Sequence, residues 1–301
     1  EISSEITSAK SLNEEKIVKQ ISSVGIAGNV ALSAFKLFAG IYGHSGAMVS
    51  DAVHSLSDVF ATLIAFIGVR LSKKSADDDH PYGHERFECV ASLLLGTVLL
   101  LTGLAIGKSG LGNILSGDYT SLAVPGAVAL VAAVVSIVVK EAMFWYTRHY
   151  AKLLNSSAFM ADAWHHRSDA LSSVAAFIGI GGAILGFKSL DSIASIFVAL
   201  FIAKVGIEIL IGSANELMDI SIDEEKEKEI KTIVDEVEGI KSLREIRTRK
   251  YGAMAYVDLV ICVDKDISVF EGHRIASDLE NLILKKMKFI KGVNIHVEPL
   301  I

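Results

Sequence analysis

The chain contains little cysteine and no excess of basic side chains. Its only two cysteines, Cys89 and Cys262, lie far apart and form no C-x-x-C pair. This excludes a disulfide framework and a metal clip built from closely spaced thiolates. The 29 Lys and Arg residues are outnumbered by 35 Asp and Glu residues, which gives a formal net charge of −6. We therefore expect no basic surface for a nucleic acid.

Hydrophobic residues, by contrast, are abundant. They make up 51% of the chain, and the mean hydropathy is +0.46, which is typical of a membrane protein. A helix needs about 20 apolar residues to cross a bilayer. Six segments reach that length and are predicted to be transmembrane helices: 21–42, 47–71, 87–106, 122–146, 157–185 and 190–211.

Charged residues concentrate at the end of the chain. Residues 215–301 hold 18 acidic and 14 basic side chains, half of the total. This shift predicts three parts. They are a polar lead-in at 1–18, interfacial or disordered, a six-helix membrane domain at 19–212 and a soluble domain at 213–301.

The basic residues also predict an orientation, because cytoplasmic loops of membrane proteins are enriched in Lys and Arg. One side of the predicted membrane domain holds only Lys108 and Lys188. We therefore expect an integral protein of the cytoplasmic (inner) membrane with both termini in the cytoplasm. The other side holds Lys10, Lys16, Lys19, Arg70, Lys73, Lys74, Arg86, Arg148 and Lys152.

The soluble part reads helix, strand, strand, helix, strand. A helical pattern with acidic residues in its first turn starts near residue 223 and ends at Gly239. Two alternating segments follow, with Tyr251 and Gly252 between them. An amphipathic stretch and the segment GVNIHVEP close the chain. This order predicts two helices packed on a three-stranded sheet.

One pattern, Asp-Ala-x-His-x-x-Ser-Asp, occurs twice within apolar stretches, at residues 51–58 and 162–169. In each copy the His and the final Asp are four residues apart and so share a helix face. Two such faces could surround one ion with two imidazoles and two carboxylates, which suits Zn²⁺ and its chemical neighbours. The predicted ligands are His54, Asp58, His165 and Asp169. The alternative is a buried hydrogen-bond network that joins the two helices.

Two further acidic residues, Asp51 and Asp162, lie three residues before these histidines. We expect them either to hold the ligand imidazoles by hydrogen bonds or to line the path to the site.

The loop after the second segment offers another candidate metal site. Asp77, His80 and His84 are spaced D-x-x-H-x-x-x-H, and Pro81 and Gly83 indicate a turn. Three such donors suit a more exposed metal site. The alternative is an acidic solvated loop with incidental histidines.

Taken together, these motifs resemble the cation diffusion facilitator family over essentially the whole chain. The matching segments are HSLSD at 54–58, DDDHPYGHERFE at 77–88 and HHRSD at 165–169. The resemblance implies a homodimer in the lipid bilayer that expels divalent metal from the cytoplasm in exchange for protons. It also implies a metallochaperone-like α+β tail with regulatory metal sites.

Carried over by motif, the resemblance also implies positions in the tail and at the dimer. The tail candidates are Asp258, His273, His296 and Glu298. Arg244 and Val260 stand where some members have histidines, which argues against a complete two-metal tail site. For His273 the alternative is an ordinary surface histidine. A charge pair that locks the family's dimer would here be Arg86 with Asp219.

The predicted function is thus a Zn²⁺/H⁺ antiporter that works by alternating access, with metal as cargo and regulatory ligand and with no cofactor. The alternative cargo is Fe²⁺, Mn²⁺, Cd²⁺ or Co²⁺, carried by a transporter of the same family. The alternative mechanism is a metal-gated channel. Because no Ser-His or His-Glu-x-x-His arrangement occurs, we expect no enzyme activity.

Overall fold

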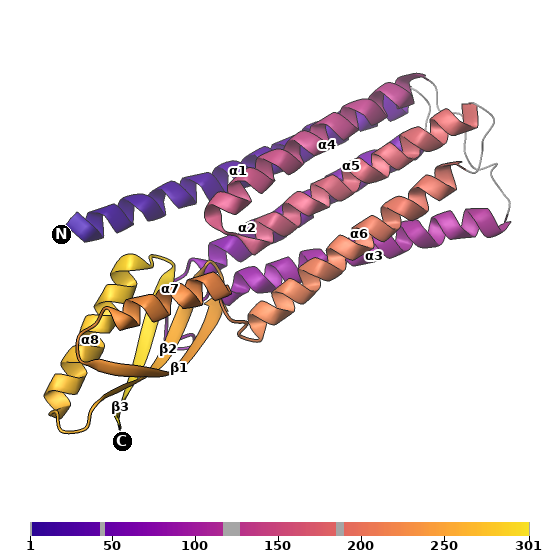
Figure 1. Ribbon diagram of the computed structural model, residues 1–301. Helices are drawn as coiled ribbons and strands as arrows, with labels where there is room; N and C mark the ends of the chain where they lie inside the picture. Colours follow the sequence, from indigo (N-terminus) through magenta and orange to yellow (C-terminus); the bar gives the residue numbers. More distant parts are fainter. Residues whose placement is uncertain (1, 43–45, 117–126, 185–189, 301) are drawn as a thin grey trace. The chain divides into compact units, whose positions relative to one another are not determined.

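The computed structural model describes the backbone over residues 2–42, 46–116, 127–184 and 190–300 (Figure 1). By compactness the chain divides into two units, Glu1–Ser213 and Ala214–Ile301. Within the described backbone, some side chains are outside the description, namely those of 2–13, 39–40, 42, 46–51, 53–54, 57, 127–130, 176, 179–184, 190–192 and 194–195.

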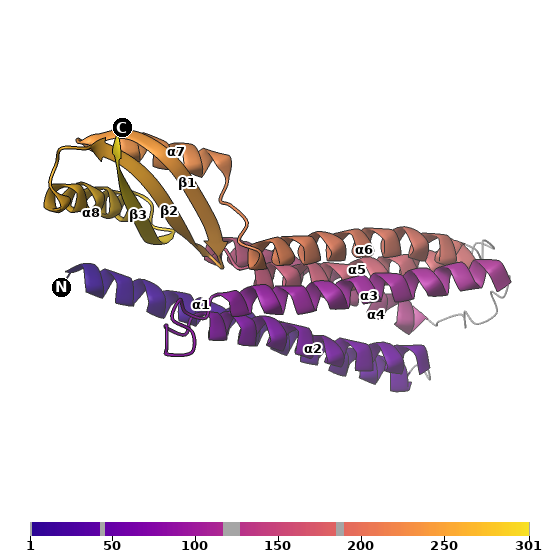
Figure 2. The ribbon, with the colours of Figure 1, turned by 90° about the horizontal axis from the view of Figure 1, so that it is seen from below.

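The first unit is a bundle of long helices that run alongside one another (Figures 1 and 2). The shortest has 27 residues, or about 40 Å at 1.5 Å per residue, which exceeds the thickness of a bilayer's hydrocarbon core. The helices are α1 (Ile2–Tyr42), α2 (Gly46–Ser72), α3 (Arg86–Ser116), α4 (Ala127–Leu154), α5 (Ser157–Ile184) and α6 (Leu190–Leu217). Three ranges in the described part are long and apolar enough to cross a membrane, namely Glu14–Phe38, Arg86–Ser116 and Ile196–Leu217.

The polar lead-in is a correction to the sequence prediction. The segment 1–18 was expected to be interfacial or disordered. Because α1 is helical from Ile2 onward, disorder is wrong for the described backbone, whereas an interfacial position stays a prediction. Glu15 and Lys19 form an ion pair at 2.7 Å with i,i+4 spacing, which supports a helix there. The polar start and the apolar span are therefore one continuous helix.

The bundle exposes large apolar side chains, and its interior contains buried polar side chains beside an apolar core. Leu101, Leu104 and Phe197 are well exposed, as expected of lipid-facing side chains. Where α3 and α6 meet, a Cβ added at Gly206 would lie 2.8 Å from the backbone nitrogen of Leu100, so a small residue permits close packing. The interior, in contrast, buries polar side chains: Asn29, Lys36, Asp58, Lys140, Asp162, His165, His166 and Asp169.

The second unit is the predicted small α+β domain. It contains α7 (Glu224–Asp235), β1 (Ile240–Tyr251), β2 (Met254–Asp264), α8 (Val269–Lys286) and β3 (Ile290–Leu300). The sheet order is β1-β2-β3, with β1 antiparallel and β3 parallel to β2. Both helices cover one face of the sheet (Figures 1 and 2). The predicted fold class, a helical membrane domain followed by an αββαβ domain, is confirmed. The core of the second unit contains Ile230, Ile233, Leu259, Ile261, Leu279 and Ile283.

Candidate metal sites

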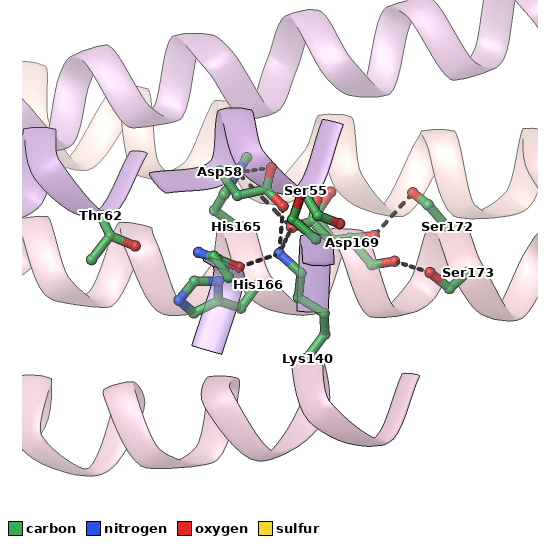
Figure 3. Close-up of polar contacts among 12 residues, drawn as sticks. Ser55, Asp58, Thr62, Lys140, His165, His166, Asp169, Ser172 and Ser173 are labelled. Atoms are coloured by element: carbon green, nitrogen blue, oxygen red, sulfur yellow. Dashed lines mark hydrogen bonds and ion pairs between the residues drawn. The ribbon is translucent and has the colours of Figure 1, made fainter. Parts of the chain in front are cut away.

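Three predicted ligands meet inside the helical bundle (Figure 3). Asp58 comes from α2, and His165 and Asp169 come from successive turns of α5. Each offers one ligand atom within 4.8 Å of the others, and all three residues are buried. The i,i+4 spacing on α5 and the packing of α2 against α5 therefore produce a cluster of one imidazole and two carboxylates.

The imidazole of His165 is suited to bind an ion. Its Nε2 lies 3.5 Å from Oδ1 of Asp58 and 4.0 Å from Oδ2 of Asp169. Within the described part of the chain, neither ring nitrogen makes a hydrogen bond. Buried polar atoms normally have a partner, so this ring fits a metal ligand.

A lysine that the sequence analysis did not single out reaches into the same cluster. Nζ of Lys140 on α4 lies 2.5 Å from Oδ2 of Asp58 and 2.8 Å from Oδ2 of Asp169. It also donates to Oδ1 of Asn29 on α1 at 2.9 Å. Three acceptors match the three protons of an ammonium, and Lys140 is 1% exposed. The signal in the sequence was a single lysine within the apolar stretch VAAVVSIVVK.

Asp162 lies beside this cluster, among other partners than expected. Its Oδ1 accepts a hydrogen bond from the hydroxyl of Thr62 at 3.2 Å, and its Oδ2 lies 3.7 Å from Nε2 of His166. Both Asp162 and His166 are fully buried. In the described residues Asp162 makes no hydrogen bond to His165, so its predicted supporting role stays a prediction.

The remaining members of the first motif cannot be placed in the same way. The side chains of His54 and Asp51 lie outside the described residues. His54 as the fourth ligand, and Asp51 as its support, stay predictions. Lys36 on α1, also buried, donates to the hydroxyl of Ser55 at 2.8 Å.

The loop between α2 and α3 also gathers its predicted donors. Asp77, His80 and His84 bring ligand atoms within 4.8 Å of one another. The Nδ1 of His84 lies 3.1 Å from the carbonyl oxygen of Ser75. Because a carbonyl only accepts, Nδ1 carries the proton, which leaves the lone pair of Nε2 available. That Nε2 is 3.5 Å from Oδ2 of Asp77.

The Asp77 carboxylate at the centre of this loop is held by two donors. Lys74 donates to Oδ2 at 2.6 Å, and the backbone N–H of His80 donates to Oδ1 at 2.9 Å. Gly83, with φ of 97°, makes the turn that returns His84 toward Asp77. The hydrogen bond from Lys74 holds the pKa of Asp77 well below its usual range, so this ligand is ionised at any physiological pH.

The tail candidates are more dispersed. Asp258, His296 and Glu298 lie on the sheet, whereas His273 lies on α8. Nε2 of His296 is 3.6 Å from Oε1 of Glu298, and Arg244 donates to the other Glu298 oxygen. The described residues contain no tail group of three donors within metal-binding distance, so a tail metal site stays a prediction.

The predicted dimer charge pair involves both units. Arg86 is the first residue of α3, and Asp219 follows the end of α6. Because they belong to different units, their pairing also stays a prediction.

Comparisons with known proteins cover both units. A family model described as "Cation efflux transmembrane domain" matches residues 22–218, and "Cation efflux protein, cytoplasmic domain" matches residues 222–300. Magnetosome protein MamB of Magnetospira sp. (strain QH-2) is 35% identical over 272 residues, which cover 90% of this chain and 92% of that protein. Manganese efflux system protein MneP of Bacillus subtilis (strain 168) is 32% identical over 292 residues, 95% of this chain and 97% of that protein.

Two further similarities are weaker in coverage. Metal tolerance protein C1 of Arabidopsis thaliana is 32% identical over 293 residues, 93% of this chain and 62% of that protein. A solved structure of a MamM CTD variant has 20% sequence identity and a TM-score of 0.26, and covers 26% of this chain and 95% of its own.

Proposed function

Because the chain belongs to the cation efflux family, whose members are transporters and not enzymes, we propose that it exports Zn²⁺ from the cytoplasm in exchange for protons. The chain is a membrane-embedded metal cation efflux transporter. The cargo metal, the counter-ion and the binding residues are our proposal. It rests on one observation, the buried cluster of Asp58, His165 and Asp169.

The donor atoms support a divalent transition metal as cargo. An imidazole nitrogen and carboxylate oxygens are ordinary zinc ligands at about 2.0 to 2.2 Å. The present separations, such as 3.5 Å between His165 Nε2 and Asp58 Oδ1, can be bridged by one ion that binds both atoms. His54 would complete a tetrahedral set from α2.

Manganese is the second candidate cargo. Two of the three described donors are carboxylate oxygens, which suit Mn²⁺ better than imidazole does. A relative that matches nearly the whole chain is named as a manganese efflux protein. The two metals therefore have to be compared directly.

Proton exchange follows from the chemistry of the ligands. Histidine binds metal only in its neutral form, and its ordinary pKa lies near neutrality. Protons and metal therefore compete for the same lone pairs. A site open to the cytoplasm would bind metal and release protons, and the same site open to a more acidic outside would do the reverse. Alternating access of one site then couples the two fluxes.

The second unit supports a homodimer in the membrane. Residues 222–300 match the cytoplasmic domain of the family, whose model is called a dimer domain. We propose that two copies associate through this unit, with both termini in the cytoplasm of the inner membrane. Metal bound at Asp77, His80 and His84 would add a regulatory site near that side.

The test is transport by purified protein in liposomes with an imposed pH gradient. We expect Zn²⁺ uptake driven by the gradient, competition by Mn²⁺, Fe²⁺, Co²⁺ and Cd²⁺, and loss of uptake in His165→Ala. The matched control is His149→Ala, because His149 is an exposed histidine on the neighbouring helix α4. Equal uptake by wild type and His165→Ala would refute the site, and uptake that ignores the gradient would favour a channel or uniporter.

A further inference from the structure

The ammonium of Lys140 stands where the proposed cargo would bind. It donates to Oδ2 of Asp58 and to Oδ2 of Asp169, the same two carboxylates that contribute to the donor cluster. A metal ion that binds both carboxylates would therefore share them with a second cation only a few ångströms away. Like charges at that distance repel strongly where water is excluded.

Lys140 also balances the charge of the two carboxylates when no metal is bound. Two carboxylates buried in a membrane protein are costly unless a cation balances them. Lys140 leaves the pair with a formal charge of −1 instead of −2. A transporter that has exchanged its metal for protons has to move the metal-free site back across the low-dielectric bundle, and a smaller buried charge makes that movement easier.

Asn29 provides a place to which the ammonium can withdraw. Its side-chain oxygen, on α1, accepts from the same Nζ at 2.9 Å and is neutral. Asn29 is fully buried. If metal takes the two carboxylates, Lys140 can keep this one hydrogen bond and rotate away from the cluster without losing its charge.

We propose that Lys140 is a tethered counter-cation that alternates with the cargo metal at Asp58 and Asp169. The inference builds on the proposed function and assigns to α4 a residue that sets metal affinity and the return of the empty transporter. No proton leaves Lys140 in this exchange: metal enters, the ammonium withdraws to Asn29, and it returns when metal departs.

The first test is Lys140→Met, which keeps the length of the side chain and removes its charge. Metal binding to the purified protein should tighten by about tenfold or more, because the competing cation no longer blocks the binding-competent state. Net transport should slow at least as much, since the emptied site carries a larger charge. Exchange of labelled for unlabelled metal across the membrane, which needs no empty return, should persist and would show that the variant is folded.

The controls separate charge from position. Lys140→Arg keeps the charge and should change affinity less than Lys140→Met does. Lys204→Met removes a lysine that is also in a membrane helix but is exposed and paired with Glu208 at 3.7 Å, and it should behave as wild type. Unchanged metal affinity in Lys140→Met would overturn the inference and leave Lys140 with a purely structural role in the bundle.

A second variant decides the matter if Lys140→Met does not fold. Asn29→Leu has a similar shape and removes the neutral acceptor, so the ammonium keeps only the carboxylates and metal binding should weaken. Unchanged or tighter binding in Asn29→Leu would count against the inference. The proposed function fails separately, if wild type neither binds nor transports Zn²⁺ or Mn²⁺.

Discussion

The ammonium of Lys140 on α4 lies 2.5 Å from Oδ2 of Asp58 on α2, although the two residues are 82 positions apart in the chain. With Asp169 and Asn29 they form a buried network that links α1, α2, α4 and α5. The same network occupies the proposed cargo site. Stability and transport should therefore respond differently to changes in it.

Asp58→Asn should remove a proposed metal ligand and also break a buried ion pair. We expect loss of metal transport and a fall in the free energy of unfolding of about 3 kcal/mol, because Lys140 loses one of its two carboxylates. The measurements are uptake by proteoliposomes and thermal unfolding in detergent.

The double variant Asp58→Asn with Lys140→Met provides the control for that prediction. It removes one charge of each sign, so stability should return toward that of wild type while transport stays absent. If the double variant loses as much free energy of unfolding as the two single variants together, the ion pair does not couple these residues.

Thr62→Val should destabilise the bundle through Asp162. The Thr62 hydroxyl donates to the fully buried carboxylate of Asp162 at 3.2 Å, and valine has nearly the same shape without a donor. A buried polar group left without its partner costs about 1 to 3 kcal/mol. Thermal unfolding measures this loss. Thr97→Val is the control, because within the described part of the chain Thr97 donates only to a backbone oxygen of its own helix, that of Leu93. An effect of equal size there would contradict the prediction.

Much of this arrangement was accessible from sequence, and the reason is periodicity. His165 and Asp169 are one helical turn apart, so their common face followed from spacing alone. The order of strands and helices in the second unit likewise followed from alternation and turn residues such as Gly252.

Other contacts of the site depend on which helices pack against one another, and no local sequence pattern predicts that packing. In the sequence Lys140 is a lone lysine in an apolar segment. Its role depends on the packing of α4 against α1 and α5. Asp162 shares its helix with His165 but contacts Thr62 and His166, because neighbouring helices decide which partners are available. The helical start of α1 was missed because its polar composition was taken as a sign of an interfacial or disordered segment.

The loop site should respond to Lys74 in the way that the bundle site responds to Lys140. Lys74 donates to Oδ2 of Asp77 at 2.6 Å, so Lys74→Met should tighten Zn²⁺ binding there by about two- to fivefold at low salt, and less at high salt. The measurement is Zn²⁺ titration in a His165→Ala background. Lys73→Met is the control, because Lys73 pairs with Glu14 instead, and equal effects of the two variants would contradict the prediction.

The pH dependence of that site has a definite sign. The hydrogen bond from Lys74 lowers the folded-state pKa of Asp77. The ionised carboxylate therefore contributes stability above the unfolded-state pKa. That contribution is lost only as the pH falls through the folded-state pKa. Between about pH 5 and 8 Asp77 should therefore stay ionised, and protonation of this carboxylate should not release the metal. A midpoint of metal release near the ordinary pKa of a carboxyl group would contradict this.

His165→Asp tests what sets the choice of metal. The described donors are one imidazole nitrogen and two carboxylate oxygens, and the substitution makes all three oxygens, which favours Mn²⁺ over Zn²⁺. Lys140 remains to balance part of the added negative charge. We expect the ratio of Zn²⁺ to Mn²⁺ transport to fall by about tenfold, equal to about 1.4 kcal/mol of relative affinity. His149→Asp makes the same change at an exposed position on α4 and should leave the ratio unaltered. If His165→Asp also leaves it unaltered, the imidazole does not select the metal, and selectivity then has to come from the geometry that the helices impose on the carboxylates.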